Sequence, residues 1–153
     1  MTLAIERAAA QTSSVSERRA MTCEERFLIH RGSCHCGAVK IEVDAPADIE
    51  VYECNCSMCQ RVGFLHLIVP AARFRLVSGS DGLSTYTFNT GVAKHSFCQV
   101  CGVKSFYVPR SNPDGFSVNL RCLDRVTIRS VKILPFDGQN WEASGAALVD
   151  LTH

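Results

Sequence analysis

Cysteine is the residue type in this sequence that most directly suggests chemistry. The chain holds nine cysteines, and seven of them fall into three short clusters. These clusters are Cys34-His35-Cys36, Cys54-Asn-Cys56-Ser-Met-Cys59 and Cys98-Gln-Val-Cys101. Thiolate sulfur is a preferred ligand of Zn²⁺, and the residues that bind one Zn²⁺ ion are often close together in sequence. The clustering therefore favours metal binding over cross-linking by disulfides.

The third cluster carries the clearest metal-binding signal. A C-x-x-C pair lets one tight turn aim two sulfur atoms at one ion, and Gly102 permits the backbone angles of such a turn. A redox C-x-x-C pair would need a βαβ pattern, and the sequence shows none. Cys34 and Cys36 supply the two further thiolates that would complete a closed site with Cys98 and Cys101. Four thiolates in a closed site are typical of a structural zinc.

The second cluster has three cysteines and no fourth of its own. Three protein ligands with an open fourth position are typical of a catalytic zinc. C-x-C-x-x-C is compact enough for one loop to supply all three ligands. We therefore predict that Cys54, Cys56 and Cys59 hold a catalytic zinc whose open position accepts water, hydroxide or a thiol. A thiol bound there would be deprotonated and nucleophilic at neutral pH.

Spacing alone leaves alternatives open for these clusters. The second cluster could form another structural site with His35, His66 or His95 as fourth ligand, or could hold no metal. The first and second clusters could also share one ion. Of the remaining cysteines, Cys23 is expected to be incidental. Cys122 is expected to be a small buried residue, with a place in a pocket wall as the alternative.

Charge and hydropathy restrict the classes of partner. The chain has 16 basic and 15 acidic residues, and seven thiolates with two Zn²⁺ ions would lower its formal charge from +1 to −2. That balance gives no field to attract nucleic acid or an anionic membrane. No stretch approaches the roughly 18 apolar residues that span a bilayer. The N-terminus also lacks the apolar core of a secretory signal, so we expect a cytoplasmic location.

The elements that must position the clusters are short and β-like. A length of 153 residues with 46% hydrophobic content fits one globular domain. We expect a flexible tail over 1–26 and a mainly β domain over 27–153. Val39, Ile41 and Val43 alternate with polar residues, as in a half-buried strand. Further predicted elements are strands at 49–53, 64–69, 74–77, 83–88, 103–108 and 126–134, and a short helix over 139–148.

Three stretches of the sequence resemble motifs of the glutathione-dependent formaldehyde-activating enzyme family. They are GSCHCGAV at 32–39, CNCSMC at 54–59 and AKHSFCQVCG at 93–102. Further stretches are similar to the centromere protein V branch of that family, and the resemblance covers about residues 31–142. These are 68–71, 86–90, 106–113 and 122–124.

The resemblance implies a β-tent, a single domain of small antiparallel sheets stapled by zinc. It implies a structural zinc on Cys34, Cys36, Cys98 and Cys101, and a catalytic zinc on Cys54, Cys56 and Cys59. The reaction that it implies is the reversible joining of formaldehyde to glutathione to give S-hydroxymethylglutathione, which is carbon–sulfur lyase chemistry.

Function and substrate contacts remain hypotheses at the level of sequence. The first hypothesis is a zinc-dependent lyase acting on a small thiol such as glutathione. The alternatives are a non-catalytic, zinc-stabilised protein-interaction module and a zinc or thiol-redox sensor. A guanidinium matches a carboxylate, so Arg61 and Arg110 are candidates to bind glutathione. His95 is a candidate general base or supporting residue, and Trp141 is expected in the core.

Overall fold

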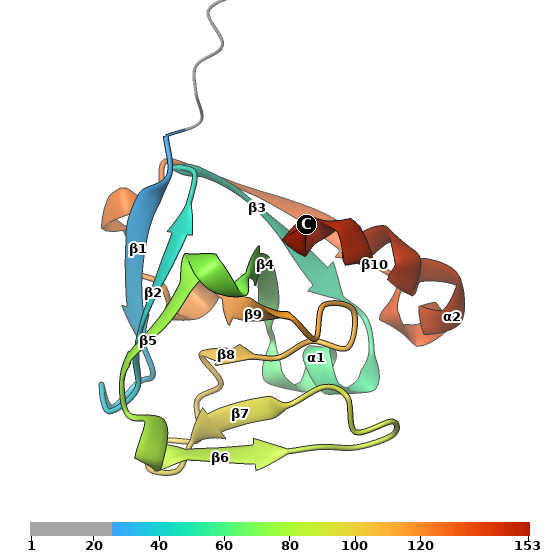
Figure 1. Ribbon diagram of the computed structural model, residues 1–153, viewed down its shortest axis with the longest axis horizontal. Coiled ribbons are helices and arrows are strands. Elements are labelled where there is room, and N and C mark those ends of the chain that lie inside the picture. The colour runs from blue at the N-terminus through green and yellow to red at the C-terminus, as the bar shows by residue number, and fades with distance from the viewer. Residues whose placement is uncertain (1–25) are drawn as a thin grey trace, which may run out of the picture.

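A computed structural model describes residues 26–153 (Figure 1). The predicted tail, except its last residue, lies outside the described residues, as does Cys23. The strands are short. They are β1 (Leu28–Ser33), β2 (Lys40–Ala45), β3 (Asp48–Cys54), β4 (Leu65–Pro70), β5 (Phe74–Ser78), β6 (Leu83–Tyr86), β7 (His95–Cys98), β8 (Phe106–Tyr107), β9 (Gly115–Asn119) and β10 (Ser130–Phe136). The α-helices are α1 (Ser57–Val62) and α2 (Trp141–Ser144), and a 3₁₀ helix over Gly145–Thr152 follows α2.

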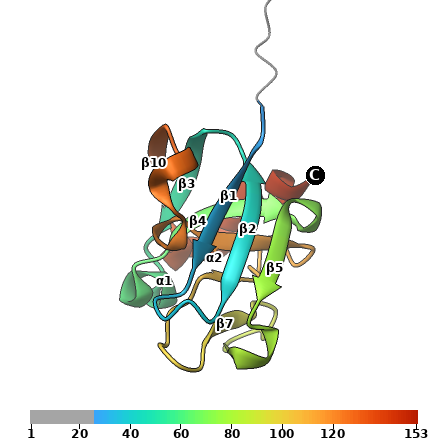
Figure 2. The same cartoon turned by 90° about the vertical axis from the view of Figure 1, so that its left-hand side faces the viewer.

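The strands form three small sheets, which confirms the mainly β, single-domain prediction. Their orders are β1-β2-β5, β10-β3-β4-β9-β8 and β6-β7. Figure 2 shows the first sheet facing the viewer with the five-stranded sheet behind it. All pairs are antiparallel except β10 and β3, which run parallel with Ser130 opposite Asp48.

The core lies between the three-stranded and five-stranded sheets. Ile41 and Val43 of β2 are buried while Lys40 points to solvent, so the predicted alternation is confirmed. Phe74 of β5 stacks on Phe116 of β9 with ring centroids 4.3 Å apart, and this contact joins the two sheets. Strand β4 is buried on both faces because it lies in the middle of the larger sheet.

Several predicted boundaries are wrong, each for a local reason. The strand predicted over 126–134 begins only at Ser130, because Arg125–Thr127 forms a 3₁₀ turn first. The strand predicted over 103–108 is reduced to β8 because residues 103–105 belong to the connection that follows the third cysteine cluster. The helix predicted over 139–148 is α-helical only in α2. Strands β1, β7 and β9 were not predicted.

The described residues contain no helix that is both long and apolar enough to cross a membrane.

Candidate metal centres and active-site cavity

The first and third cysteine clusters meet in space. The sulfur atoms of Cys34, Cys36, Cys98 and Cys101 all lie within 4.8 Å of one another. Cys36 Sγ is 3.6 Å from Cys34 Sγ and 3.7 Å from Cys98 Sγ. Four sulfurs placed tetrahedrally at about 2.3 Å from Zn²⁺ would be separated by about 3.8 Å. The four residues therefore fit a closed tetrathiolate site.

Two tight turns present these four sulfurs. Cys34 and Cys36 lie in the connection from β1 to β2, where the Val39 N–H donates to Cys34 Sγ at 3.3 Å. Cys98 ends β7, and the Gly102 N–H donates to its carbonyl oxygen at 2.8 Å. Gly102 adopts a φ of +72°, which a residue with a Cβ rarely adopts. A metal here would tie the three-stranded sheet to the β6–β7 hairpin (Figure 1).

The second cluster forms a separate group. The sulfurs of Cys54, Cys56 and Cys59 lie within 4.8 Å of one another, and among residues 26–153 no histidine nitrogen joins either group at that spacing. The predicted single loop is in fact a strand end and a short helix, because Cys54 ends β3 and Cys59 lies in α1. Cys56 is the N-cap of α1, where its Sγ accepts from the Cys59 N–H at 3.4 Å.

Hydrogen bonds and burial make this trio a good cation site. The Cys56 N–H donates to Cys54 Sγ at 3.5 Å, and such donors favour a thiolate. The hydrogen bond with Cys54 lowers the pKa of Cys56, while the same neighbour raises the pKa of the buried Cys59. Three close sulfurs thus resist losing all their protons together. A divalent cation would remove that conflict, since it deprotonates every thiol that it binds.

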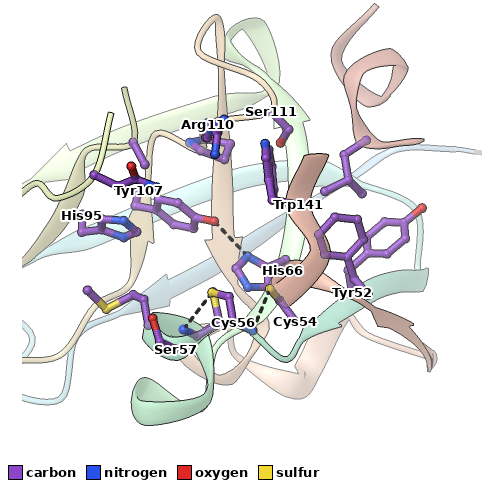
Figure 3. Close-up of a pocket in the computed structure, with 18 of the residues that line it drawn as sticks. Tyr52, Cys54, Cys56, Ser57, His66, His95, Tyr107, Arg110, Ser111 and Trp141 are labelled. Carbon is purple, nitrogen blue, oxygen red and sulfur yellow. Dashed lines mark hydrogen bonds between the residues drawn. The ribbon is translucent and has the colours of Figure 1, made fainter. Parts of the chain in front are cut away.

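The trio lies at the edge of a cavity of about 370 Å³, which is within the range of small-molecule sites. Figure 3 shows Cys54, Cys56 and Ser57 on one side of it, and Arg110, Ser111 and Trp141 on the opposite side. The wall between these two sides contains both polar and apolar side chains. It includes Tyr52, His66, Ile68, Phe88, His95 and Tyr107.

Arg110 lines this cavity and Arg61 is not among the lining residues. The Arg110 guanidinium donates to Glu142 Oε1 at 3.0 Å and lies 5.1 Å from the centre of the Trp141 ring. Arg61 is exposed at the end of α1 and donates to the Ser57 carbonyl oxygen at 2.6 Å. Trp141 is a cavity wall rather than a core residue, because its helix follows β10 at the rim of the domain.

A cluster of buried polar side chains lies next to the cavity. It includes Lys104 and Tyr107, which were not identified from the sequence as candidate site residues. Tyr107 Oη lies 3.3 Å from His66 Nδ1, and Lys104 Nζ lies 2.6 Å from His95 Nδ1. Burial lowers the pKa of His66 to about 3 and of His95 to about 4, so both imidazoles are neutral near pH 7. Burial also lowers the pKa of Lys104 to about 8. Cys122 is half-buried and lies outside the cavity lining.

Comparison with known proteins gives one family. The family model described as "Glutathione-dependent formaldehyde-activating enzyme" matches residues 29–136. A Halomonas elongata protein, named as a candidate enzyme of this kind, is 29% identical over 82 residues. That alignment covers 48% of this chain and 52% of the relative, so the match spans about half of the curated relative's length. A solved structure of a Rhodobacter sphaeroides protein is 39% identical with a TM-score of 0.58 and covers 63% of this chain and 89% of that one.

The family match includes every residue of the two sulfur groups. Residues 29–136 contain all seven clustered cysteines, and they make up well over half of the chain. The protein therefore belongs to the glutathione-dependent formaldehyde-activating enzyme family.

Proposed function

We propose that the protein is a zinc-dependent carbon–sulfur lyase that forms and cleaves the adduct of glutathione and formaldehyde, S-hydroxymethylglutathione. The observation that carries this proposal is the group of three cysteines, without a fourth protein ligand among residues 26–153, on one side of a cavity of small-molecule size. The family match supplies the thiol and the aldehyde as the reactants. Within the family, the stretches at 68–71 and 106–113 support a place near the centromere protein V branch.

Two zinc ions per chain are part of this proposal. Cys34, Cys36, Cys98 and Cys101 would hold a structural ion, and Cys54, Cys56 and Cys59 the other. When bound by three thiolates, zinc keeps a coordination position open and lowers the pKa of a thiol that enters it. The chain's part is to hold three sulfurs on a rigid strand end and helix start, with their lone pairs partly engaged by backbone N–H groups.

The far side of the cavity would bind the carboxylate end of glutathione. Arg110 offers a planar guanidinium, and Trp141 beside it offers a flat apolar surface. The present partner of Arg110 is Glu142, whose side chain is 87% exposed. An ion pair that exposed is weak, so a ligand carboxylate can replace it at little cost. Arg61 shares the chemistry but lies outside the cavity, so we assign this role to Arg110.

The bond changes of the reaction determine where the reacting atoms must lie in the cavity. In the forward direction the thiol loses its proton, the sulfur bonds to the aldehyde carbon, and the carbonyl electron pair moves to oxygen. The oxygen then takes a proton, and the reverse reaction undoes each change. The reacting carbon must therefore lie near the three sulfurs, in the part of the cavity lined by His66, His95 and Tyr107.

The proposal is tested by replacing one ligand of the trio. Cys56→Ser should fold, keep one metal ion per chain and lose turnover of glutathione and formaldehyde. The matched control is Cys122→Ser, at a half-buried cysteine outside both sulfur groups, and it should keep two ions and full turnover. A folded Cys56→Ser variant with full turnover would contradict the lyase. Unfolding of that variant, with no turnover in the parent protein, would favour the interaction module instead.

The spectrum of cobalt-substituted protein gives an independent test of the open position. Two tetrahedral thiolate spectra are expected, and only the spectrum of the three-cysteine site should change as glutathione is added. Two spectra that both ignore glutathione would contradict glutathione as the ligand.

A further inference from the structure

Lys104 is a buried cation without a carboxylate partner among the described residues. Its side chain is 8% exposed, and its Nζ lies 3.9 Å from the centre of the Tyr107 ring and 5.0 Å from that of Phe64. Burial lowers its pKa to about 8, and the nearby sulfurs of Cys56 and Cys59 offset only part of that fall. A desolvated ammonium is retained in a protein only where its surroundings compensate the charge. Here the faces of the Tyr107 and Phe64 rings do so.

Within the described part of the chain, the one polar atom in hydrogen-bond contact with this ammonium is His95 Nδ1, at 2.6 Å. An ammonium has three N–H donors and no lone pair, so it can only donate. His95 Nδ1 must then be the acceptor, and the proton of the neutral imidazole must lie on Nε2. The ring is also held in place, because it stacks between Phe88 and Tyr107 at 5.3 Å and 4.9 Å.

The other ring nitrogen of His95 has no partner in the described structure. Nε2 is buried and makes no hydrogen bond, although the ring lines the same cavity as the three cysteines. Figure 3 places His95 beside Tyr107 on the wall above Ser57, where α1 begins. Buried N–H groups are almost always satisfied, so an orphaned donor in a cavity wall indicates an acceptor that arrives with a ligand.

We infer that His95, held in the Nε2–H form by Lys104, donates a hydrogen bond to the oxygen of the one-carbon electrophile. This inference rests on the proposed function. As sulfur bonds to carbon, the carbonyl electron pair moves to oxygen, and a fixed donor stabilises the charge that develops there. The proton that the thiol released reaches that oxygen through solvent, and His95 keeps its own. Lys104 is a positioning residue, and His95 is a donor rather than a general base, which was one of its two candidate roles in the sequence.

The first test reads the protonation of the ring without any substrate. In the zinc-loaded full chain, ¹⁵N NMR of the histidine rings should show His95 with an unprotonated Nδ1 and a protonated Nε2. Lys104→Met, which is close in shape and cannot donate, should abolish this fixed pattern. Lys132→Met, the same change at an exposed strand position, should leave it intact. A proton on Nδ1 in the parent protein, or no change in Lys104→Met, would overturn the inference.

The second test reads the donor during catalysis. Replacing one oxyanion donor costs about 10²–10³-fold in kcat, so His95→Leu should lose about 10²-fold in kcat with little change in KM for glutathione. His95→Gln keeps an amide donor and should recover part of that loss. Lys104→Met should show a smaller loss, also in kcat. A loss confined to KM, or equal values for His95→Leu and His95→Gln, would overturn the inference.

Ligand binding separates this inference from the proposed function. Trp141, the single tryptophan, provides an indole N–H signal on the other side of the cavity. Glutathione should move the Trp141 signal, and glutathione with formaldehyde should also move the His95 Nε2–H signal. If only Trp141 responds to both additions, His95 is not the donor and the proposed function stands. If neither signal moves, the proposed function fails and the inference falls with it.

Discussion

Gly138 offers the sharpest test of the three-cysteine site. This glycine follows β10, and a Cβ built on it would lie closer than 3.0 Å to Cys54 Sγ and 3.0 Å from Cys56 Cβ. Ordinary contacts between carbon atoms are about 3.5–4.0 Å, so the sulfur or the turn must move by more than about 0.5 Å. Metal–ligand distances tolerate shifts of only about 0.2 Å. Gly138→Ala should therefore disturb the trio directly.

The size of the effect follows from the cost of overpacking. Inserting a methyl group into a filled space costs about 1–3 kcal/mol, which corresponds to about a 5- to 150-fold loss of metal affinity if the strain falls on the bound state. Metal content and competition with a chelator measure this directly. The variant should keep one tightly bound ion per chain, on the Cys34, Cys36, Cys98 and Cys101 group, and lose the other in mild chelator.

A matched control is available at Gly82. A Cβ there meets nothing within 4 Å, and the backbone angles suit any residue, so Gly82→Ala should keep both ions. If Gly138→Ala holds two ions as tightly as the parent and turns over at the same rate, the packing argument is refuted. If it loses both ions, the two sulfur groups are not independent.

Three further predictions concern the metal groups, the ligand and the surface charges. Cys98→Ser should unfold the domain under conditions where Cys56→Ser stays folded, as measured by circular dichroism. The reason is that a structural zinc contributes roughly 10–16 kcal/mol, while the stability of a domain is about 5–15 kcal/mol. Equal stabilities of the two variants would refute this prediction. Arg110→Met should weaken glutathione binding by calorimetry far more than Arg61→Met, and the reverse order would move the carboxylate site to α1. Hydrogen bonds from Arg31 and then Arg75 lower the pKa of Glu42, and those from Arg75 lower the pKa of Asp44. The folded state therefore gains stability above pH about 4 and loses it as pH falls further. The free energy of unfolding should therefore differ more between parent and Arg75→Met at pH 7 than at pH 3, and a constant difference would contradict the role of these carboxylates.

The cysteine clusters are the part of the molecule that local sequence determines best. Each cluster, C-x-C, C-x-C-x-x-C or C-x-x-C-G, places its sulfur atoms through a turn only a few residues long. The sequence of that turn is therefore enough to predict which sulfurs lie together within one cluster. The alternation through Val43 likewise predicted β2, because a strand repeats every two residues. The strand predicted over 103–108 was too long, since the two paired residues of β8 leave no periodic signal that marks its ends.

The spacing of the cysteines in the sequence did not decide which clusters come together around one ion. The sequence allowed the first and second clusters to share an ion, whereas the structure sets Cys34 and Cys36 beside Cys98 and Cys101. That choice depends on how the β1–β2 turn and the β6–β7 hairpin pack. Arg61 and Arg110 had similar standing in sequence, and only the fold shows that Arg110 reaches the cavity.

What the amino-acid sequence determined by itself was the three cysteine clusters that could bind metal and the mainly β character of the domain. Both depend on residues within about six positions of one another. The tertiary structure decided the rest of the site: Gly138 packed on Cys54, and the Lys104 ammonium on the His95 ring. These contacts join residues from different strands and turns. No periodicity or spacing reports them, because they exist only once the sheets have closed around the cavity.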